Sequence, residues 1–108
     1  MDIEDLAAML REKVDSAVAR GAATPTRRAR FDLGPDGSLL LDGTIQPPVV
    51  VVAGPQAGGA ADCTLTLSGA DLAAILDGTL DPTGAFMTGR LKIAGDTGLA
   101  MQLAALMG

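Results

Sequence analysis

The end of this chain carries a predicted helix with almost no polar side. The segment from Leu99 to Met107 follows Asp96, a good N-cap, and its one polar residue is Gln102. A helix that is apolar all round has to be buried on all sides. A chain of 108 residues has little core with which to surround a terminal helix. We therefore expect something besides the chain's own core to share in covering this segment.

Two arrangements fit this helix. Leucines and a methionine fall on one side of its wheel, at positions Leu99, Leu103, Leu106 and Met107. The opposite side carries Ala100, Met101, Ala104 and Ala105. Either the leucine side meets the core and the alanine side meets water, or Met101 and the alanines line a cavity or a partner surface. Methionine suits the second role because its side chain adapts to varied shapes. The wheel alone leaves both open.

Length and composition bound the class of protein. The chain fits one domain, residues 1–108, with 48% apolar residues, 2% aromatic residues and a net charge of −5. Nucleic acid is a poor partner, since phosphate contacts need basic charge and base stacking needs aromatic rings. The single cysteine, Cys63, fits a reducing compartment. No apolar run reaches the ~20 residues of a membrane span, and the acidic N-terminus is unlike a secretory signal. We expect a cytoplasmic protein.

The first half predicts one helix and three strands. Apolar residues recur at helical spacing from Ile3 to Ala17, with Asp2 as the expected N-cap and Gly21 just beyond the end. From Arg27 the period becomes two, and a turn at residues 34–37 leads to a second strand at 38–41. Asp42-Gly43 is a two-residue hairpin signal. We expect the third strand to run from 44 to 53.

The third predicted strand has two unusual features. Pro47 and Pro48 cannot donate ladder hydrogen bonds and indicate a sheet edge or a bulge. The following segment, Val49 to Val52, is apolar on both faces, so we expect its second face to be covered. Residues 54–60 are glycine-rich, but no helix and no lysine follows as a phosphate cradle requires. We interpret them as a plain loop.

The second half alternates strands and helices. Residues 61–67 predict a strand with Cys63 and Leu65 inward, where Cys63 acts as a small hydrophobe. Ser68 and Asp71 form an approximate capping box for a helix that ends at Gly78. Asp81-Pro82 starts a short helix. A strand from Arg90 to Ala94, with Leu91 and Ile93 on one face, precedes the closing helix.

Several short motifs in this half stand in register with a known family. They are Asp62-Cys63-Thr64-Leu65-Thr66-Leu67, Asp71-Leu72, Gly78-Thr79-Leu80-Asp81-Pro82, Ala85-Phe86-Met87, Gly89-Arg90-Leu91-Lys92-Ile93, Gly95-Asp96 and Gly98-Leu99-Ala100-Met101-Gln102-Leu103. In this order they resemble the sterol-binding domain of the sterol carrier protein 2 family, almost without gaps from Asp62 to Leu103. The earlier helix and strands fit the family's layout more weakly, and residues 44–60 match it poorly. The composition is similar to that of stand-alone bacterial members.

The resemblance implies an α+β fold: a five-stranded mixed sheet covered on one face by helices, in the order α-β-β-β-β-α-α-β-α, with an apolar tunnel between sheet and helices. Members bind sterols, fatty acids, fatty acyl-CoAs, phospholipids and isoprenoid-like molecules, without catalytic residues of their own. We expect the ligand to be a lipid or another long apolar molecule, with no cofactor. The residues expected to line the tunnel are Leu76, Phe86, Met87, Leu91, Ile93, Leu99, Met101 and Leu103.

Other classes of function remain as alternatives. An enzyme has little to work with, because the chain contains no histidine and no tyrosine and its carboxylates fit helix caps and strand ends. No His/Cys cluster or Asp-rich loop suggests a metal. The stronger alternative is an accessory module that forms a homodimer or docks on a lipid-processing enzyme. Transient contact with a membrane surface is a further expectation.

Overall fold

The computed structural model describes residues 2–53 and 61–107 and has an α+β architecture. Four α-helices and five strands follow one another in the predicted order, and one 3₁₀ turn joins the first two strands. Their bounds are α1 Ile3–Ala19, β1 Arg28–Asp32, η1 Gly34–Asp36, β2 Ser38–Asp42, β3 Val49–Ala53, β4 Cys63–Thr66, α2 Gly69–Asp77, α3 Pro82–Met87, β5 Lys92–Gly95 and α4 Thr97–Met107.

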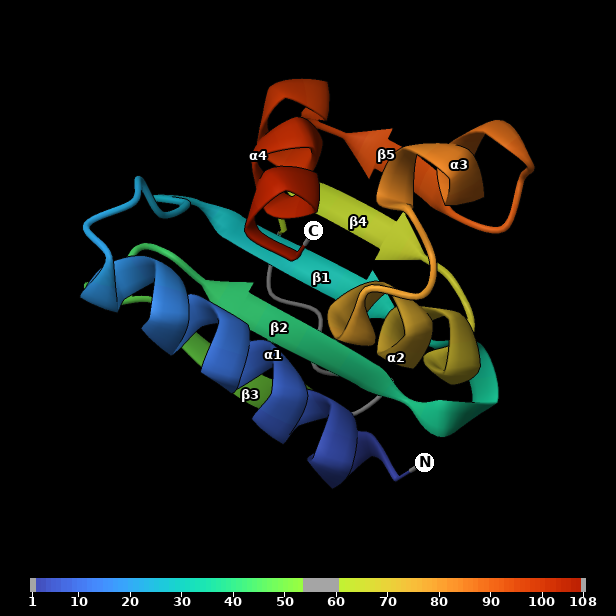
Figure 1. Ribbon diagram of the computed structural model, residues 1–108, viewed down its shortest axis with the longest axis horizontal. Helices are drawn as coiled ribbons and strands as arrows, with labels where there is room; N and C mark the ends of the chain where they lie inside the picture. Colours follow the sequence, from blue (N-terminus) through green and yellow to red (C-terminus); the bar gives the residue numbers. More distant parts are fainter. Residues whose placement is uncertain (1, 54–60, 108) are drawn as a thin grey trace.

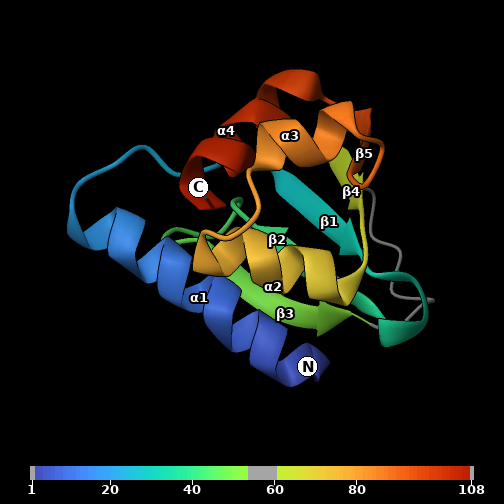
Figure 2. The same ribbon diagram turned by 45° about the vertical axis from the view of Figure 1, so that its right-hand side comes forward.

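The five strands form one mixed sheet in the order β3-β2-β1-β4-β5. Its centre is the parallel pair β1 and β4, and the other neighbouring strands are antiparallel. The helices lie on one face of this sheet (Figures 1 and 2). Side chains alternate between the two faces, so that Phe31, Leu39 and Leu65 are buried beneath the helices. The predicted five-stranded sheet with helices on one face is confirmed.

Helix α1 packs its apolar stripe against α2 and the β2–β3 half of the sheet. Leu6, Leu10 and Val14 are at most 1% exposed, as the helical spacing predicts. The helix ends with Gly21 just beyond it at φ 71°. The N-cap prediction is wrong in one respect. Asp2 stands at the N-cap position, but its side chain accepts no hydrogen bond from the described part of α1.

Helix α2 begins and ends at the predicted capping residues, and α3 begins at its predicted N-cap. The Ser68 hydroxyl accepts a hydrogen bond from the Asp71 amide at 3.0 Å, and the Asp81 carboxylate accepts one from the Gly84 amide at 3.0 Å. These bonds satisfy amides that have no partner within the helix. Gly78 ends α2 in the left-handed conformation, with φ 86°. Local sequence therefore fixes where both helices start.

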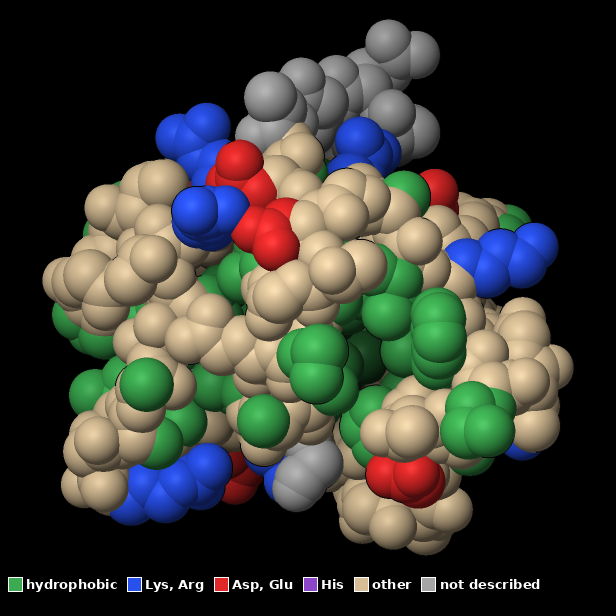
Figure 3. All heavy atoms as spheres, turned by 90° about the horizontal axis from the view of Figure 1, so that it is seen from above, with side chains coloured by type: hydrophobic (Ala, Val, Ile, Leu, Met, Phe, Trp, Pro, Cys, Tyr) green, Lys and Arg blue, Asp and Glu red, His purple; other side chains and the backbone are tan. Residues whose placement is uncertain are grey.

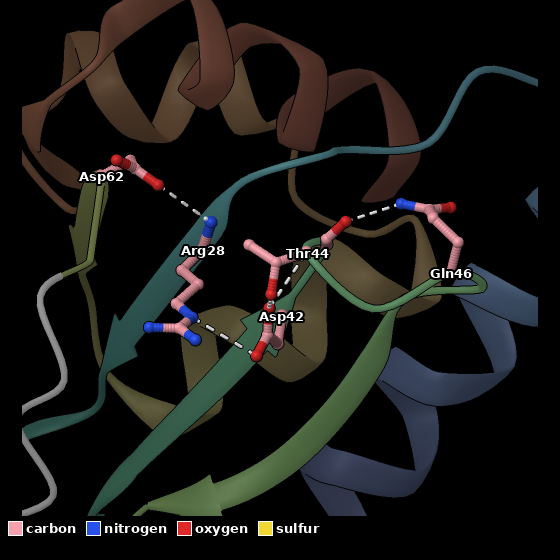
Figure 4. A network of polar contacts seen from close by, with 6 residues as sticks. Arg28, Asp42, Thr44, Gln46 and Asp62 are labelled. Carbon is pink, nitrogen blue, oxygen red and sulfur yellow. Dashed lines mark hydrogen bonds and ion pairs between the residues drawn. The ribbon is translucent and has the colours of Figure 1, made fainter.

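The two-residue hairpin at Asp42-Gly43 is not formed. Asp42 is the last residue of β2, and β3 begins only at Val49. The Asp42 carboxylate accepts hydrogen bonds from the Thr44 amide, at 2.9 Å, and from the Thr44 hydroxyl (Figure 4). The side-chain amide nitrogen of Gln46 donates to the backbone carbonyl of Gly43 at 2.6 Å and to that of Pro25 at 3.3 Å. These side-chain bonds support a longer loop, and the prolines that follow cannot join the ladder.

The valine strand is an edge strand, but its second face is not covered as we expected. Among the described strands, β3 pairs only with β2, which agrees with the prolines that precede it. Val50 is 4% exposed beneath α1, whereas Val49, Val51 and Val52 are 37%, 43% and 38% exposed. Val49 and Val51 lie on the face away from α1, whereas Val52 shares the face of Val50, opposite the buried Leu39, and is nevertheless partly exposed. The loop predicted at 54–60 lies outside the described residues.

The last strand starts two residues later than predicted. The amides of Arg90 and Leu91 both donate to the carbonyl of Ala85, at 2.9 and 3.1 Å. This ties them to the end of α3 and keeps them out of the ladder, so β5 begins at Lys92. Leu91 is nevertheless buried, at 4% exposure.

A candidate lipid cavity between the sheet and the last two helices

An apolar cavity of about 300 Å³ lies where α3 and α4 meet the β4–β5 side of the sheet. In Figure 3 hydrophobic side chains gather around a hollow on the face that α3, α4 and β5 form at the top of Figure 1. The volume is at the lower end of the ~300–1,000 Å³ range of ligand pockets. The residues that line it are Leu65, Pro82, Thr83, Phe86, Leu91, Ile93, Thr97, Ala100, Met101, Ala104 and Met107.

Strands β4 and β5 and helix α4 each bring part of this lining together. Leu65 and Ile93 stand opposite each other in the β4–β5 ladder and so share a face of the sheet. The α4 residues of the lining, Thr97, Ala100, Met101, Ala104 and Met107, recur at three- and four-residue spacing and form one side of the helix. The Asp96 carboxylate accepts a hydrogen bond from the Leu99 amide at 3.2 Å and sets the start of α4.

The chemistry of the lining is that of a hydrocarbon site. Among the described residues it contains no charged side chain, and its polar members are the hydroxyls of Thr83 and Thr97. Asp81, which caps α3, and Asp96, which caps α4, are already engaged by helix amides. Asp96 also forms an ion pair with Arg27. Nothing in this lining is arranged for acid–base or nucleophilic chemistry.

The structure brings half of the expected tunnel residues together. Phe86, Leu91, Ile93 and Met101 line the cavity. Leu99 and Leu103, at 5% and 0% exposure, belong to the core beneath α4. Leu76 borders a separate surface depression beside Met9 on α1.

Met87 stands apart from the cavity lining. Its side chain is 80% exposed on α3, directly after Phe86.

Several lining residues were not expected from the sequence. Leu65 could have been found only through its register opposite Ile93, which depends on knowing the strand pairing. Ala100 and Ala104 lie beside Met101 on the helical wheel, as one of the two arrangements for this helix supposed. Both arrangements hold in part. The three leucines of α4 meet the core, and Met107 from the same side also reaches the cavity. Most of the alanine side lines the cavity, and Ala105 is exposed.

Cys63 lies near this region but within the core. It is 1% exposed on β4. Burial, and to a smaller extent the negative charge of Asp96, raises the pKa of the Cys63 thiol. The side chain therefore packs as a neutral hydrophobe.

The described residues contain neither a candidate metal cluster nor a membrane-spanning helix. In residues 2–53 and 61–107, no three His, Cys, Asp or Glu side chains gather closely enough to hold a metal ion. Over the same residues, no helix combines the length and apolar character that crossing a bilayer requires.

A comparison with protein families shows to which family the chain belongs. The model of the SCP-2 sterol transfer family matches the chain from residue 3 to residue 108. The chain belongs to the SCP-2 sterol transfer family. The sterol carrier protein 2 resemblance seen in the sequence motifs is thereby confirmed.

Sequence relatives of this SCP-2 family chain are much longer proteins. The sterol carrier protein 2 of Rattus norvegicus is 48% identical over 52 residues, which are 48% of this chain and 10% of the rat protein. Only a small part of the relative is therefore matched.

Solved structures share the SCP-2 fold over more of the chain. Palmitated SCP2L2 from Aedes aegypti matches with a TM-score of 0.75 and 20% identity, covering 99% of this chain and 95% of the mosquito protein. The UbiJ-SCP2 ubiquinone synthesis protein matches with a TM-score of 0.54 and 25% identity, covering 76% and 69%.

Proposed function

We propose that residues 1–108 act as one non-catalytic domain that binds a lipid in the α3–α4 cavity and transfers it. The observation that carries this proposal is the apolar lining of the cavity. Among the described residues of that lining, the polar side chains are those of Thr83 and Thr97. Membership of the SCP-2 sterol transfer family supports it. The Aedes aegypti protein whose fold this chain shares was solved in its palmitated form. The cytoplasm is the proposed location, because Cys63 is a free thiol.

The free energy of such binding comes from hydrocarbon removed from water. Each buried methylene contributes ~0.8 kcal/mol, so a chain of about 16 carbons gains ~12 kcal/mol before ordering costs. A bilayer offers nearly the same gain, so transfer between bilayer and protein is close to isoenergetic. An adaptable apolar cavity suits that exchange better than strong polar recognition does.

The size and polarity of the cavity define the class of ligand. A volume of about 300 Å³ suits one aliphatic chain or one compact isoprenoid or sterol-like body. Charged groups are costly to bury without partners. The head group of a fatty acid, fatty acyl-CoA or phospholipid would therefore stay at the opening, where Thr83 is exposed.

Filling the cavity tests the proposal. Ala104 lines it, whereas Ala8 is an exposed alanine on α1 and does not belong to the lining. We expect Ala104→Leu to weaken binding of a fluorescent fatty acid about tenfold or more, because the added atoms occupy the ligand's space. Ala8→Leu is the matched control and should bind as the unmodified chain does. Native mass spectrometry of the purified protein should show a co-purified lipid mass. Equal binding by both variants, with no lipid mass, would refute the proposal.

A second candidate is an accessory module that assembles through β3. The exposed valines of that edge strand favour it, since exposed edges pair readily with other chains. The UbiJ-SCP2 neighbour, a ubiquinone synthesis protein, is compatible with an accessory role. In this case native mass spectrometry should show an empty dimer. Val51→Lys, which places a charge on the strand, should return it to monomer.

A further inference from the structure

The methionines of the described chain differ in how far solvent reaches them. Met101 on α4 is 74% exposed and Met87 on α3 is 80% exposed, whereas Met107 is 1% exposed. Met9 on α1 is partly buried against the core. Met101 and Met107 line the cavity, and Met87 and Met9 do not. Among the described residues, Met101 is therefore the methionine that is both open to dissolved reagents and placed to touch a bound ligand.

The thioether sulfur of an exposed methionine reacts with peroxides. Hydrogen peroxide, a two-electron oxidant, converts the thioether to a sulfoxide. The O–O bond of the peroxide breaks, one oxygen atom forms the new bond to sulfur, and the other oxygen leaves as water with both protons. The sulfur loses two electrons and the peroxide gains them. The remaining side chains of the cavity lining are aliphatic, aromatic or hydroxyl groups, so the thioethers are its oxidisable groups.

A sulfoxide at Met101 changes the polarity of the site more than its shape. Oxidation turns a flexible apolar side chain into a polar one. When the cavity is empty, the new oxygen lies in water, because the side chain is 74% exposed. A hydrocarbon ligand that covers the oxygen removes its hydrogen bonds to water, and a polar group buried without a partner is costly. The oxidation therefore acts on ligand affinity and leaves the unliganded fold unstrained.

We propose that Met101 is a site of reversible oxidation by hydrogen peroxide, and that its sulfoxide releases the lipid from the cavity. The inference rests on the proposed function, because it requires a ligand that touches Met101. Cys63 does not compete for the oxidant, since its thiol is 1% exposed and its pKa is raised by burial. Enzymes that reduce methionine sulfoxide regenerate the thioether, so the released state returns to the binding state.

The test uses the second exposed methionine as an internal comparison. Met101→Leu replaces the thioether by an apolar side chain that forms no sulfoxide. Met87→Leu is the matched control, because Met87 is an exposed helical methionine outside the lining. Both variants and the unmodified chain are treated with hydrogen peroxide, and peptide mass spectrometry follows oxidation at each methionine. The affinity for a fluorescent fatty acid is measured before treatment, after treatment, and after reduction by methionine sulfoxide reductases with dithiothreitol.

We expect peroxide to lower the affinity of the unmodified chain and of Met87→Leu about tenfold, and reduction to restore it. The affinity of Met101→Leu, whatever its starting value, should not respond to peroxide. Saturating fatty acid should slow the oxidation of Met101 and leave that of Met87 unchanged.

Three results would overturn the proposal: unchanged affinity in a chain oxidised at Met101, an equal loss in Met101→Leu, or a loss that reduction does not reverse. Absence of fatty-acid binding before any oxidation would instead refute the proposed function, and this inference with it. The two failures are distinguishable because affinity is measured in the untreated chain first.

Discussion

Among single residues, Asp42 accepts three side-chain hydrogen bonds where β2 ends. Its carboxylate accepts from Thr44 and from the Arg28 guanidinium, whose Nε lies at 3.3 Å (Figure 4). Asp42→Ala removes the acceptor, and we expect it to lower the free energy of unfolding by about 1 kcal/mol. Urea unfolding measures this change. Asp77→Ala is the control, because Asp77 accepts the same two bonds from Thr79 on the open surface. An equal or larger loss in the control would contradict the assignment.

The same carboxylate gives stability a dependence on pH. Hydrogen bonding from the Thr44 hydroxyl is the largest cause that lowers the pKa of Asp42 below its ordinary value of 3.8. A pKa lowered by folding stabilises the native state above the unfolded value, and that contribution is lost as the pH falls through the folded value. We expect the stability difference between the unmodified chain and Asp42→Asn to shrink below pH 3.8. Urea unfolding at a series of acidic pH values measures it. A difference that stays constant would contradict this account.

Cys63 should be chemically silent in the native protein. Its thiol is buried and its pKa is raised, so few thiolates form and reagents cannot reach them. We expect labelling by a thiol reagent at pH 8 to be slow in buffer and complete within seconds in urea. Folding raises the pKa of this thiol. The contribution of the neutral thiol to the free energy of unfolding is therefore present below pH 9.0, the ordinary pKa of a thiol, and is lost as the pH rises above that value. Labelling at equal speed in both solutions would show that the thiol is accessible.

At the scale of whole elements, α4 divides its two sides between stability and binding. Leu103 is fully buried, whereas Met101 is 74% exposed and lines the cavity. We expect Leu103→Ala to lower the free energy of unfolding by about 2–5 kcal/mol. Met101→Ala should change it by less than ~0.5 kcal/mol and should weaken fatty-acid binding. Urea unfolding and fluorescence titration separate the two effects. A reversed order of the two stability losses would contradict this division.

How well elements can be predicted depends on the range of the interactions that define them. Helices α2 and α3 start as expected, because Ser68 and Asp81 cap them through bonds that span three residues. The hairpin prediction failed because Gln46 reaches the carbonyl of Pro25, 21 positions away. The start of β5 moved because Ala85 binds the amides of Arg90 and Leu91. Caps that span three residues are visible in the sequence, whereas the turn that Ala85 closes over five and six residues and the contact across 21 positions are not.

For the molecule as a whole, the motifs from Asp62 onward gave the fold and the general place of the cavity. They did not give its lining in full. Leu65 enters the lining through its pairing with Ile93, and Leu103 leaves it because the wheel cannot tell core from cavity. The exposure of Val49 and Val51 on one face and of Val52 on the other was also missed, since an apolar run does not say how far each of its faces is covered. A cavity is space left over by packing, so it follows from the complete three-dimensional arrangement.

A ligand that occupies this space should stabilise the whole molecule. A ligand that binds the folded chain alone adds about 2.7 kcal/mol to the free energy of unfolding at 100 times its dissociation constant. We expect saturating fatty acid to raise the melting temperature of the unmodified chain and of Ala8→Leu by similar amounts. Ala104→Leu should respond little, because its leucine already fills part of the cavity that Ala104 lines. Calorimetry of the three proteins, with and without fatty acid, measures these shifts. If Ala104→Leu shifted as far as the others, the fatty acid would be binding somewhere other than the α3–α4 cavity.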